Sequence, residues 1–204
     1  NGLATDTLLP WLASGRAGFM YVDSADNNTL KQVAMTEAAA DVSTWTSLYG
    51  ATSNVRVGTN NSVTLTGVLG DDLTINSLGF YNAGVATLAL GSGKTLTLAS
   101  GGLSYRAANS SAHQTITNGF LTSGTDKLYL NSSDSGNSAT LYIHSPIVGA
   151  TLNVFKAGIS GIDFRGTAAN TYGGTTTVNG GHLALNKTGG AIAIPGPLVV
   201  RNGG

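Results

Sequence analysis

The stretch from residue 170 to residue 204, NTYGGTTTVNGGHLALNKTGGAIAIPGPLVVRNGG, places the strongest constraint on the fold. It contains three short β runs, at 175–178, 182–185 and 198–200, and Gly-Gly or Asn-Gly turns separate them. A strand of that length buries too little apolar surface to be stable by itself. The chain must therefore supply similar strands above and below this stretch.

Similar runs recur from about residue 54 onward. Each alternates apolar residues with Thr, Asn or Ser, so one side of the run is apolar, as a half-buried strand requires. Glycines or Asn-Gly pairs separate most of them. The runs lie at 63–65, 73–75, 87–90, 95–98, 114–117, 127–130, 140–143 and 151–154.

A loose unit repeats along these runs: an apolar β residue, a spacer, Asn or Ser, often a small residue, and another apolar residue. Most copies are separated by roughly 20 residues, an interval that is typical of solenoids. The interval between Ile143 and Val178 is longer and predicts an extra coil around Phe164. The copies lie at 75–78, 98–103, 116–120, 143–147, 178–183 and 200–203.

Two architectures accommodate many short strands, an antiparallel sandwich and a parallel β-helix. A sandwich prefers longer strands, tight hairpins and several aromatic core residues. Here the runs are very short, the turns lack hairpin spacing and aromatic residues make up 7% of the chain. Stacked coils align like residues along an axis, which suits such runs. The pattern therefore favours an all-β parallel β-helix, or β-solenoid.

Residues 1–52 differ from the rest and are predicted to form an irregular N-terminal cap, with 53–204 forming the solenoid. Residues 17–23 are predicted to form a strand. Leu30, Val33, Ala34 and Ala38 fall at helical spacing, which predicts a short helix or a long loop between residues 29 and 49. The chain lacks an initiator Met and ends at the start of a turn, so we expect it to be part of a longer protein.

Composition narrows the functional classes. Charged residues make up 10% of the chain and the formal net charge is +0, which argues against nucleic acid as a partner. There is no cysteine, so disulfides, thiolate metal sites and a Cys nucleophile are excluded. No apolar run approaches the length of a membrane helix, and the apolar run 8–13 lacks the preceding basic region of a signal peptide.

The sequence NTYGGTTTVNGGHLAL, at 170–185, resembles the autotransporter-associated β-strand repeat, whose usual form is N-T-Y-x-G-G-T-T-V-x-x-G-x-L. One residue is missing after Tyr172 and one is added among the threonines. AIPG at 193–196 and the final LVVRNGG are similar to the segment that comes after this repeat in members of the family. The matching positions are Asn170, Thr171, Tyr172, Gly173, Gly174, Thr175, Thr176, Val178, Gly181 and Leu183.

Upstream segments also resemble members of that family. Residues 8–12 and 18–23 are similar to a segment that precedes such repeats. Residues 73–78 and 94–102 resemble the coils that lie between that segment and the repeat. One departure lies at 153–166, where NVFKAGISGIDFRG replaces a Gly-rich run and leaves the coil boundaries between 150 and 170 open. The resemblance implies a right-handed parallel β-helix that is secreted and displayed at a bacterial surface.

Some β-helices cleave polysaccharides, which requires paired carboxylates or a carboxylate with a basic partner. Asp71 and Asp72 are adjacent, but neighbouring strand residues point to opposite faces, so they are interpreted as a turn. Asp163 and Arg165 share a face and are interpreted as a surface ion pair. The acidic residues from residue 53 onward are Asp71, Asp72, Asp126, Asp134 and Asp163. No catalytic residue is therefore predicted.

Metal sites require ligands at suitable spacing. His113, His144 and His182 are too far apart in sequence for ligands on one element. Loops 23–28 and 134–137 (Asp23 to Asn28 and Asp134 to Asn137) offer oxygen atoms suited to calcium, but they lack a calcium-loop motif, and Asp and Asn are ordinary turn residues. No metal or cofactor site is predicted, and calcium at these two loops stays open.

The sequence predicts a non-enzymatic structural or adhesive segment of an extracellular bacterial surface protein. Its coils would continue into further repeats or stack end to end into a filament, because open β-helix ends present unpaired backbone groups. The alternative is a β-helix that binds or cleaves carbohydrate, including surface glycans, with Tyr105, Tyr129 and Tyr142 stacking on sugar rings.

Overall fold

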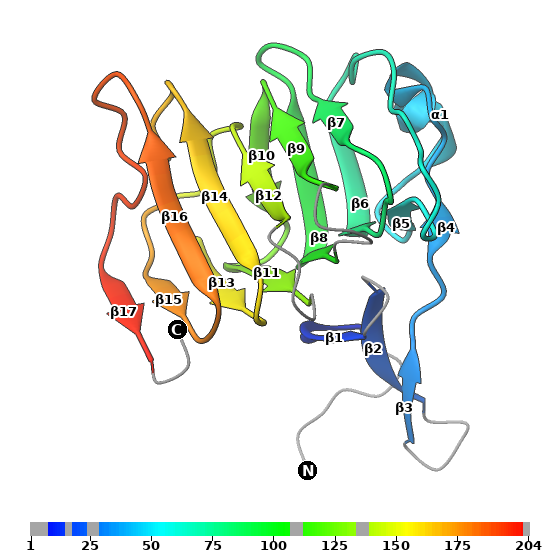
Figure 1. Cartoon of the computed structure of the whole chain (residues 1–204), viewed down its shortest axis with the longest axis horizontal. Coiled ribbons are helices and arrows are strands. Elements are labelled where there is room, and N and C mark those ends of the chain that lie inside the picture. Colours follow the sequence, from blue (N-terminus) through cyan, green and yellow to red (C-terminus); the bar gives the residue numbers. More distant parts are fainter. Residues whose placement is uncertain (1–7, 15–17, 24–28, 107–111, 134–138, 202–204) are drawn as a thin grey trace.

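The computed structural model describes residues 8–14, 18–23, 29–106, 112–133 and 139–201. It is nearly all β and forms a solenoid of about seven turns built from parallel sheets. Figure 1 shows the coils side by side in chain order, from the N-terminal coils at one end to the C-terminal coils at the other. The parallel β-solenoid expected from the short runs is confirmed, and the sandwich is excluded.

Two parallel sheets run along the solenoid, and successive coils add a strand to each (Figure 1). The larger sheet contains, in spatial order, β4 (Thr36–Glu37), β5 (Asn54–Val57), β6 (Leu73–Phe80), β8 (Thr95–Tyr105), β11 (Lys127–Ser132), β13 (Asn153–Ala157), β15 (Thr176–Val178) and β17 (Leu198–Val200). The second sheet contains β7 (Ala86–Ala89), β9 (Gln114–Thr117), β12 (Thr140–Ile143), β14 (Gly161–Gly166) and β16 (His182–Lys187).

A third, shorter face arises because β8 is long enough to belong to two faces. Its first half pairs with β10 (Phe120–Ser123) and its second half pairs with β11. Gly101 lies at the bend with φ +76°, and a side chain there would collide with the backbone carbonyl of Lys127. Only glycine allows this close approach of two coils.

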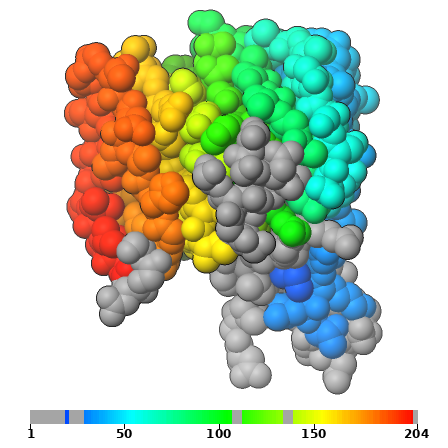
Figure 2. Space-filling model, viewed as in Figure 1, coloured from blue at the N-terminus to red at the C-terminus, as the bar shows by residue number. Residues whose placement is uncertain are grey.

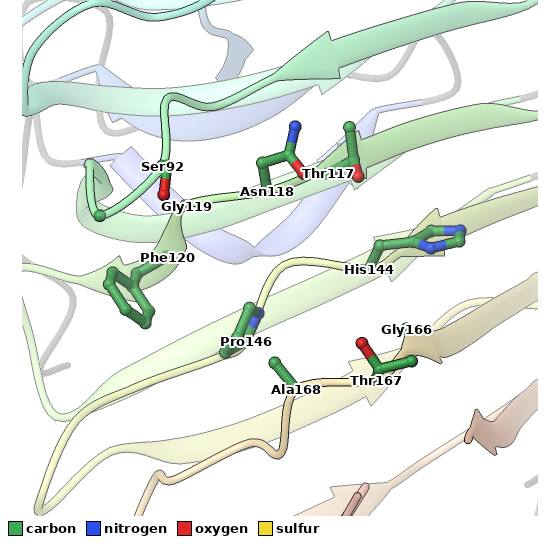
Figure 3. Close-up of a pocket in the computed structure, with 11 residues that line it drawn as sticks. Ser92, Thr117, Asn118, Gly119, Phe120, His144, Pro146, Gly166, Thr167 and Ala168 are labelled. Carbon is green, nitrogen blue, oxygen red and sulfur yellow. The ribbon is translucent and has the colours of Figure 1, made fainter. Parts of the chain in front are cut away.

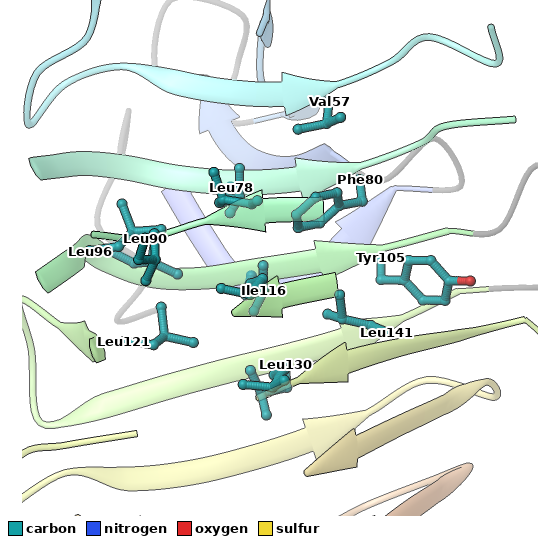
Figure 4. Packing of buried hydrophobic residues seen from close by; sticks show 14 of the residues in the cluster. Val57, Leu78, Phe80, Leu90, Leu96, Tyr105, Ile116, Leu121, Leu130 and Leu141 are labelled. Atoms are coloured by element: carbon teal, nitrogen blue, oxygen red, sulfur yellow. The ribbon is translucent and has the colours of Figure 1, made fainter. Parts of the chain in front are cut away.

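The core consists of columns of inward-facing side chains, one from each coil. In the larger sheet Leu78, Leu103 and Leu130 are register partners and all are fully buried. Figure 4 shows Leu78 and Leu130 with their apolar neighbours in the solenoid interior. The second sheet contributes a matching column, Leu88, Ile116, Ile143, Phe164 and Leu185. Stacking like residues in this way is what converts very short strands into a continuous core.

The N-terminal residues pack against the solenoid at two places. Strands β1 (Leu8–Ser14), β2 (Gly18–Asp23) and β3 (Thr29–Gln32) form a separate antiparallel sheet, in which β1 contacts β8 and β11 and β2 contacts β8. A 3₁₀ turn at Val42–Thr44 and the short helix α1 (Trp45–Leu48) follow. The Trp45 side chain is fully buried, and its Nε1 donates a hydrogen bond to the Ala39 carbonyl at 2.8 Å.

Most predicted runs from residue 73 onward are strands of the solenoid, and β14 supplies the extra coil expected around Phe164. A short helix, α1, does lie within the expected range 29–49, but Leu30 to Ala38, whose spacing suggested it, are not helical, because residues 29–32 pair with β2 as strand β3. One other expectation fails. The run 63–65 is not a strand, although Leu65 is buried from a loop.

The limits of the cap also differ from the sequence interpretation. Strand β4 pairs in parallel with β5, so the larger sheet begins at Thr36, before the expected start of the solenoid at residue 53. The sequence did not reveal this short strand because its two residues, Thr36 and Glu37, are exposed polar residues with no apolar alternation.

Candidate functional site

The outer face of the second sheet gathers histidine, aromatic and charged side chains from successive coils. The parallel register places Tyr142 beside Asp163 and Arg165 beside Asn186. His113 precedes β9, His144 follows β12 and His182 begins β16. The solenoid therefore brings all three histidines to this sheet, although they are far apart in the chain.

Asp163 and Arg165 form the ion pair that their spacing predicted. Arg165 Nε donates to Asp163 Oδ2 at 2.6 Å, and Asn186 Nδ2 donates to the same oxygen at 3.0 Å. The pair was expected at the surface. The Arg165 side chain is 38% exposed, as expected, but the Asp163 side chain is 4% exposed and therefore buried. The second carboxylate oxygen, Oδ1, is buried without a hydrogen-bond partner among the described residues.

The Tyr142 ring is covered by side chains from two neighbouring coils. The His113 imidazole stacks against it with ring centroids 5.0 Å apart, and the Arg165 guanidinium lies 3.7 Å from the ring centroid. Tyr129 stacks on Phe155 at 5.3 Å, and Tyr105 is fully buried. Tyr105 is therefore unavailable to a ligand, whereas Tyr129 and Tyr142 are half-buried on the outer faces of the two sheets.

The adjacent carboxylates Asp71 and Asp72 lie in the turn before β6, as the sequence predicted. Asp71 Oδ1 pairs with Lys94 Nζ at 3.1 Å, and Asp72 Oδ1 accepts a hydrogen bond from the Thr95 amide at 2.8 Å. Both interactions join one coil to the next. Asp126 lies beside Lys127 at 3.4 Å.

The histidines share a sheet but do not converge on a common point. Within the described ranges, no three His, Cys, Asp or Glu side chains lie close enough together to hold a metal ion. Residues 24–28 and 134–138 lie outside the described residues, so calcium at those two loops stays a hypothesis.

A groove follows the flank where the second sheet turns toward the short face; we call it the flank groove. Its volume is about 390 Å³. Figure 3 shows Phe120 and Pro146 toward one end and His144 toward the other. The groove crosses four coils, after β7, β9, β12 and β14, and is lined by Ser92, Gly93, Thr117, Asn118, Gly119, Phe120, His144, Pro146, Gly166, Thr167 and Ala168.

A tight turn shapes the groove. Asn118 and Gly119 adopt positive φ angles of 59° and 42°, which reverses the chain between β9 and β10. A side chain at position 119 would collide with the carbonyls of Gly91 and Lys94 in the preceding coil, so glycine is required there. This turn directs Phe120 outward, where its side chain is 36% exposed.

The imidazole of His144 is held in its neutral form. Burial lowers the pKa of His144 below its ordinary value of 6.5, and the positive charges of Arg165 and Lys187 lower it further. Lys187 is fixed nearby, because its Nζ donates to the Arg165 carbonyl at 2.9 Å and to the Ala168 carbonyl at 2.8 Å. At pH 7 the groove therefore has a neutral imidazole, which can donate and accept hydrogen bonds.

Lys156 is a second unusual ionisable group, and it lies inside the solenoid. It follows Leu130 in the inward column of the larger sheet and is fully buried. Its Nζ donates to the carbonyls of Ala157, Gly158 and Gly180 at 3.1, 3.1 and 2.8 Å. Burial lowers the Lys156 pKa to about 8. Sequence reasoning missed this residue, although Val154 and Lys156 are spaced to share the inward face.

Among the described residues, those of the C-terminal coil expose apolar side chains. Leu185, Leu198 and Val200 are 48%, 49% and 60% exposed, although register places them in the inward columns. Strand β17 has no further neighbour among the described residues. A cavity of about 240 Å³ opens there, lined by Val178, Gly181, His182, Leu183, Leu185, Ile194, Leu198 and Val200.

The stretch that resembles a repeat joins neighbouring coils. Asn170 is 2% exposed, and its side chain accepts a hydrogen bond from the Ile147 amide at 2.9 Å and donates one to the Ala193 carbonyl at 2.7 Å. Buried Tyr172 shares a hydrogen bond of 2.6 Å with Thr176. Gly173 and Gly174 pack against the backbone of the preceding coil so closely that a side chain would not fit.

The fold and these features define a parallel β-solenoid with one closed end, one open end and a groove on its flank. No family model, curated protein or solved structure matches the chain. In the part of the chain that the structure describes, no helix has the length and apolar character needed to cross a membrane.

Proposed function

We propose that this chain is a structural segment of a secreted bacterial surface protein, in which a rigid β-solenoid carries further coils on its C-terminal end. The observation that carries the proposal is the difference between the two ends. Trp45 and Val42 are fully buried over the first end, whereas Leu198 and Val200 are about half exposed at the last. Figure 2 shows the C-terminal coil forming one outer side of the molecule.

The closed first end favours continuation over filament formation. Head-to-tail stacking of identical rods requires an apolar acceptor at both ends, and here the apolar interior at the first end is filled by the buried Val42 and Trp45, so that, among the described residues, only the backbone edge of β4 stays uncovered. An open edge with unpaired N–H and C=O groups is best satisfied by another parallel strand of matching length. Further coils in the same chain would supply that strand at every turn.

Rigidity supports a structural role. Register pairing joins each coil to its neighbours in both sheets, and strands lie about 4.8 Å apart, so each coil lengthens the rod by that amount. Asn170 and the Asp71–Lys94 pair add side-chain links between coils. A structure of this kind transmits force along its axis without a large change in shape.

A non-enzymatic role is supported by the bonding of the carboxylates that the sequence singled out. Asp71, Asp72 and Asp163 all bind basic or amide groups of neighbouring coils or of their own strand. The extracellular location rests on the resemblance of residues 170–204 to a repeat of bacterial surface proteins and on the lack of cysteine. Adhesion is a further property that such segments often have.

The proposal is tested by adding one coil. Register pairs Val178 with Val200, so residues 179–200 span one coil, and a second copy of them would be inserted after Val200. We expect a higher free energy of unfolding in urea, because Leu185 and Leu198 would gain apolar neighbours.

The control is the same insertion with its inward Leu and Val residues replaced by Ser. If both insertions change stability equally, the end does not accept a coil. Sedimentation velocity of the unmodified chain over a wide concentration range tests the alternative, since concentration-dependent assembly that Leu198→Lys abolishes would favour a filament.

A further inference from the structure

The flank groove has the chemistry of a ligand site that is separate from the open end. Its lining residues contain no Asp, Glu, Lys or Arg, and its one histidine is held neutral. Its volume of about 390 Å³ lies within the usual range of small-molecule sites, roughly 300–1,000 Å³. A ligand of this groove would therefore be uncharged and small, or a short part of a longer chain.

One end of the groove offers an apolar platform. The Phe120 ring is 36% exposed, and Pro146 from the next coil lies beside it in the lining. Phe120 belongs to β10, whose neighbours are β8 and the bridge between Leu121 and Ile147, so its backbone is fixed on both sides. An exposed aromatic ring on a rigid backbone is a suitable surface for the C–H groups on one face of a saturated ring.

The remaining lining offers hydrogen bonds that the protein itself does not use. Among the described residues, the side chains of Asn118, His144 and Thr167 have no hydrogen-bond partner. An amide, a neutral imidazole and a hydroxyl can each donate and accept. Such groups pair well with hydroxyl groups, which also donate and accept.

The backbone of the groove is not available to a peptide. The amides of Phe120, Leu121 and His144 donate to carbonyls of adjacent coils. A peptide that binds by strand addition needs a free strand edge, and these strands already have neighbours on both sides. The observations therefore favour a ligand recognised through side chains.

The geometry points to a binding site for a neutral saccharide in the flank groove. One sugar ring would lie against Phe120 and Pro146, and its hydroxyl groups would bind Asn118, His144 and Thr167. The ion pair of Asp163 with Arg165 lies beyond His144 and holds the sheet face together without entering the lining. The site binds saccharide without cleaving it, because the groove lining has no carboxyl group to act as acid or base. This site does not depend on whether the open end accepts further coils.

The test is an NMR titration of the isotopically labelled chain with maltotriose, cellotriose and chitotriose, and with trigalacturonate as a charged probe. We expect at least one neutral trisaccharide to produce saturable shifts of the amides at 117–120, 144 and 166–168. Phe120→Ala should weaken that binding about tenfold or more, the value expected from losing an aromatic contact. His144→Ala should also weaken it.

Matched variants provide the controls. Phe155→Ala removes another outward-facing phenyl ring, and His113→Ala removes another histidine on the same sheet, but neither lines the groove. Thermal unfolding of each variant checks that it folds. The proposal is overturned if no neutral probe gives saturable groove shifts up to about 10 mM. It is also overturned if the control variants weaken binding equally, or if only trigalacturonate binds.

Discussion

The buried Lys156 makes the stability of the solenoid depend on pH in a specific window. Its pKa falls from 10.5 to about 8 because the side chain is buried without a carboxylate partner. The unfolded chain keeps this lysine protonated up to about pH 10.5, so between pH 8 and pH 10.5 the unfolded state binds more protons than the folded state. The free energy of unfolding must therefore rise with pH across that window.

The size of this effect follows from the two pKa values. Below pH 8 the charged form costs the folded state about 3 kcal/mol, and raising the pH from 7 to 10 relieves about 2.5 kcal/mol of that cost. Above pH 10 a second effect of opposite sign overlaps with that of Lys156. Burial raises the pKa of Tyr172, so the contribution of Tyr172 to stability falls as the pH rises.

The assay is urea unfolding at several pH values between 7 and 10 for the unmodified chain and for Lys156→Met. Methionine keeps the apolar part of the side chain but cannot ionise, so we expect the rise in stability to shrink by about 2.5 kcal/mol in the variant. Some rise remains, since burial also lowers the pKa of Lys187. Lys127→Met, at an exposed position, is the control and should keep the full rise. Equal slopes for the unmodified chain and Lys156→Met would refute the reasoning.

Two further predictions concern packing and the links between coils. Leu130→Ala should lower the free energy of unfolding by about 2–5 kcal/mol, whereas Leu185→Ala, 48% exposed at the open end, should cost clearly less; equal costs in urea unfolding would contradict the column packing. Asn170→Ala should cost about 2–5 kcal/mol, because it leaves a buried amide and a buried carbonyl unpaired. Asn179→Ala, exposed and without such bonds, should change stability by less than about 0.5 kcal/mol, and a similar loss in both variants would argue against the proposed link.

The positions of the strands were largely predictable, because alternation with a period of two reports directly on burial in a half-buried strand. Runs 114–117, 140–143 and 198–200 coincide with β9, β12 and β17. Alternation failed where burial comes from a loop, as at Leu65, and where pairing with a neighbouring strand overrides helical spacing, as at residues 29–32.

The flank groove was less accessible to sequence reasoning. Distances of about 31 and 38 residues between the histidines hid their common sheet, because the loops between coils vary in length. A usable signal existed in the strands themselves, since His113, His144 and His182 each adjoin or begin a run of the second sheet. Phe120 follows an Asn-Gly turn, which predicts a reversal but not the direction of the next side chain.

The difference between the two ends of the solenoid also predicts where the chain opens first. In a solenoid each coil is stabilised by its neighbours, so a coil with only one neighbour has the lowest local stability. The C-terminal coil has its apolar side chains half exposed, whereas the first coils are covered by the buried Trp45. Amide hydrogen exchange should therefore be fastest in β17, slower in β15 and β16, and slowest in the central strands β8 and β11. Appending the duplicated coil 179–200 should move the fast exchange outward and protect β17. If β17 exchanges as slowly as β8 in the unmodified chain, its edge is already covered, and the open-end proposal is wrong.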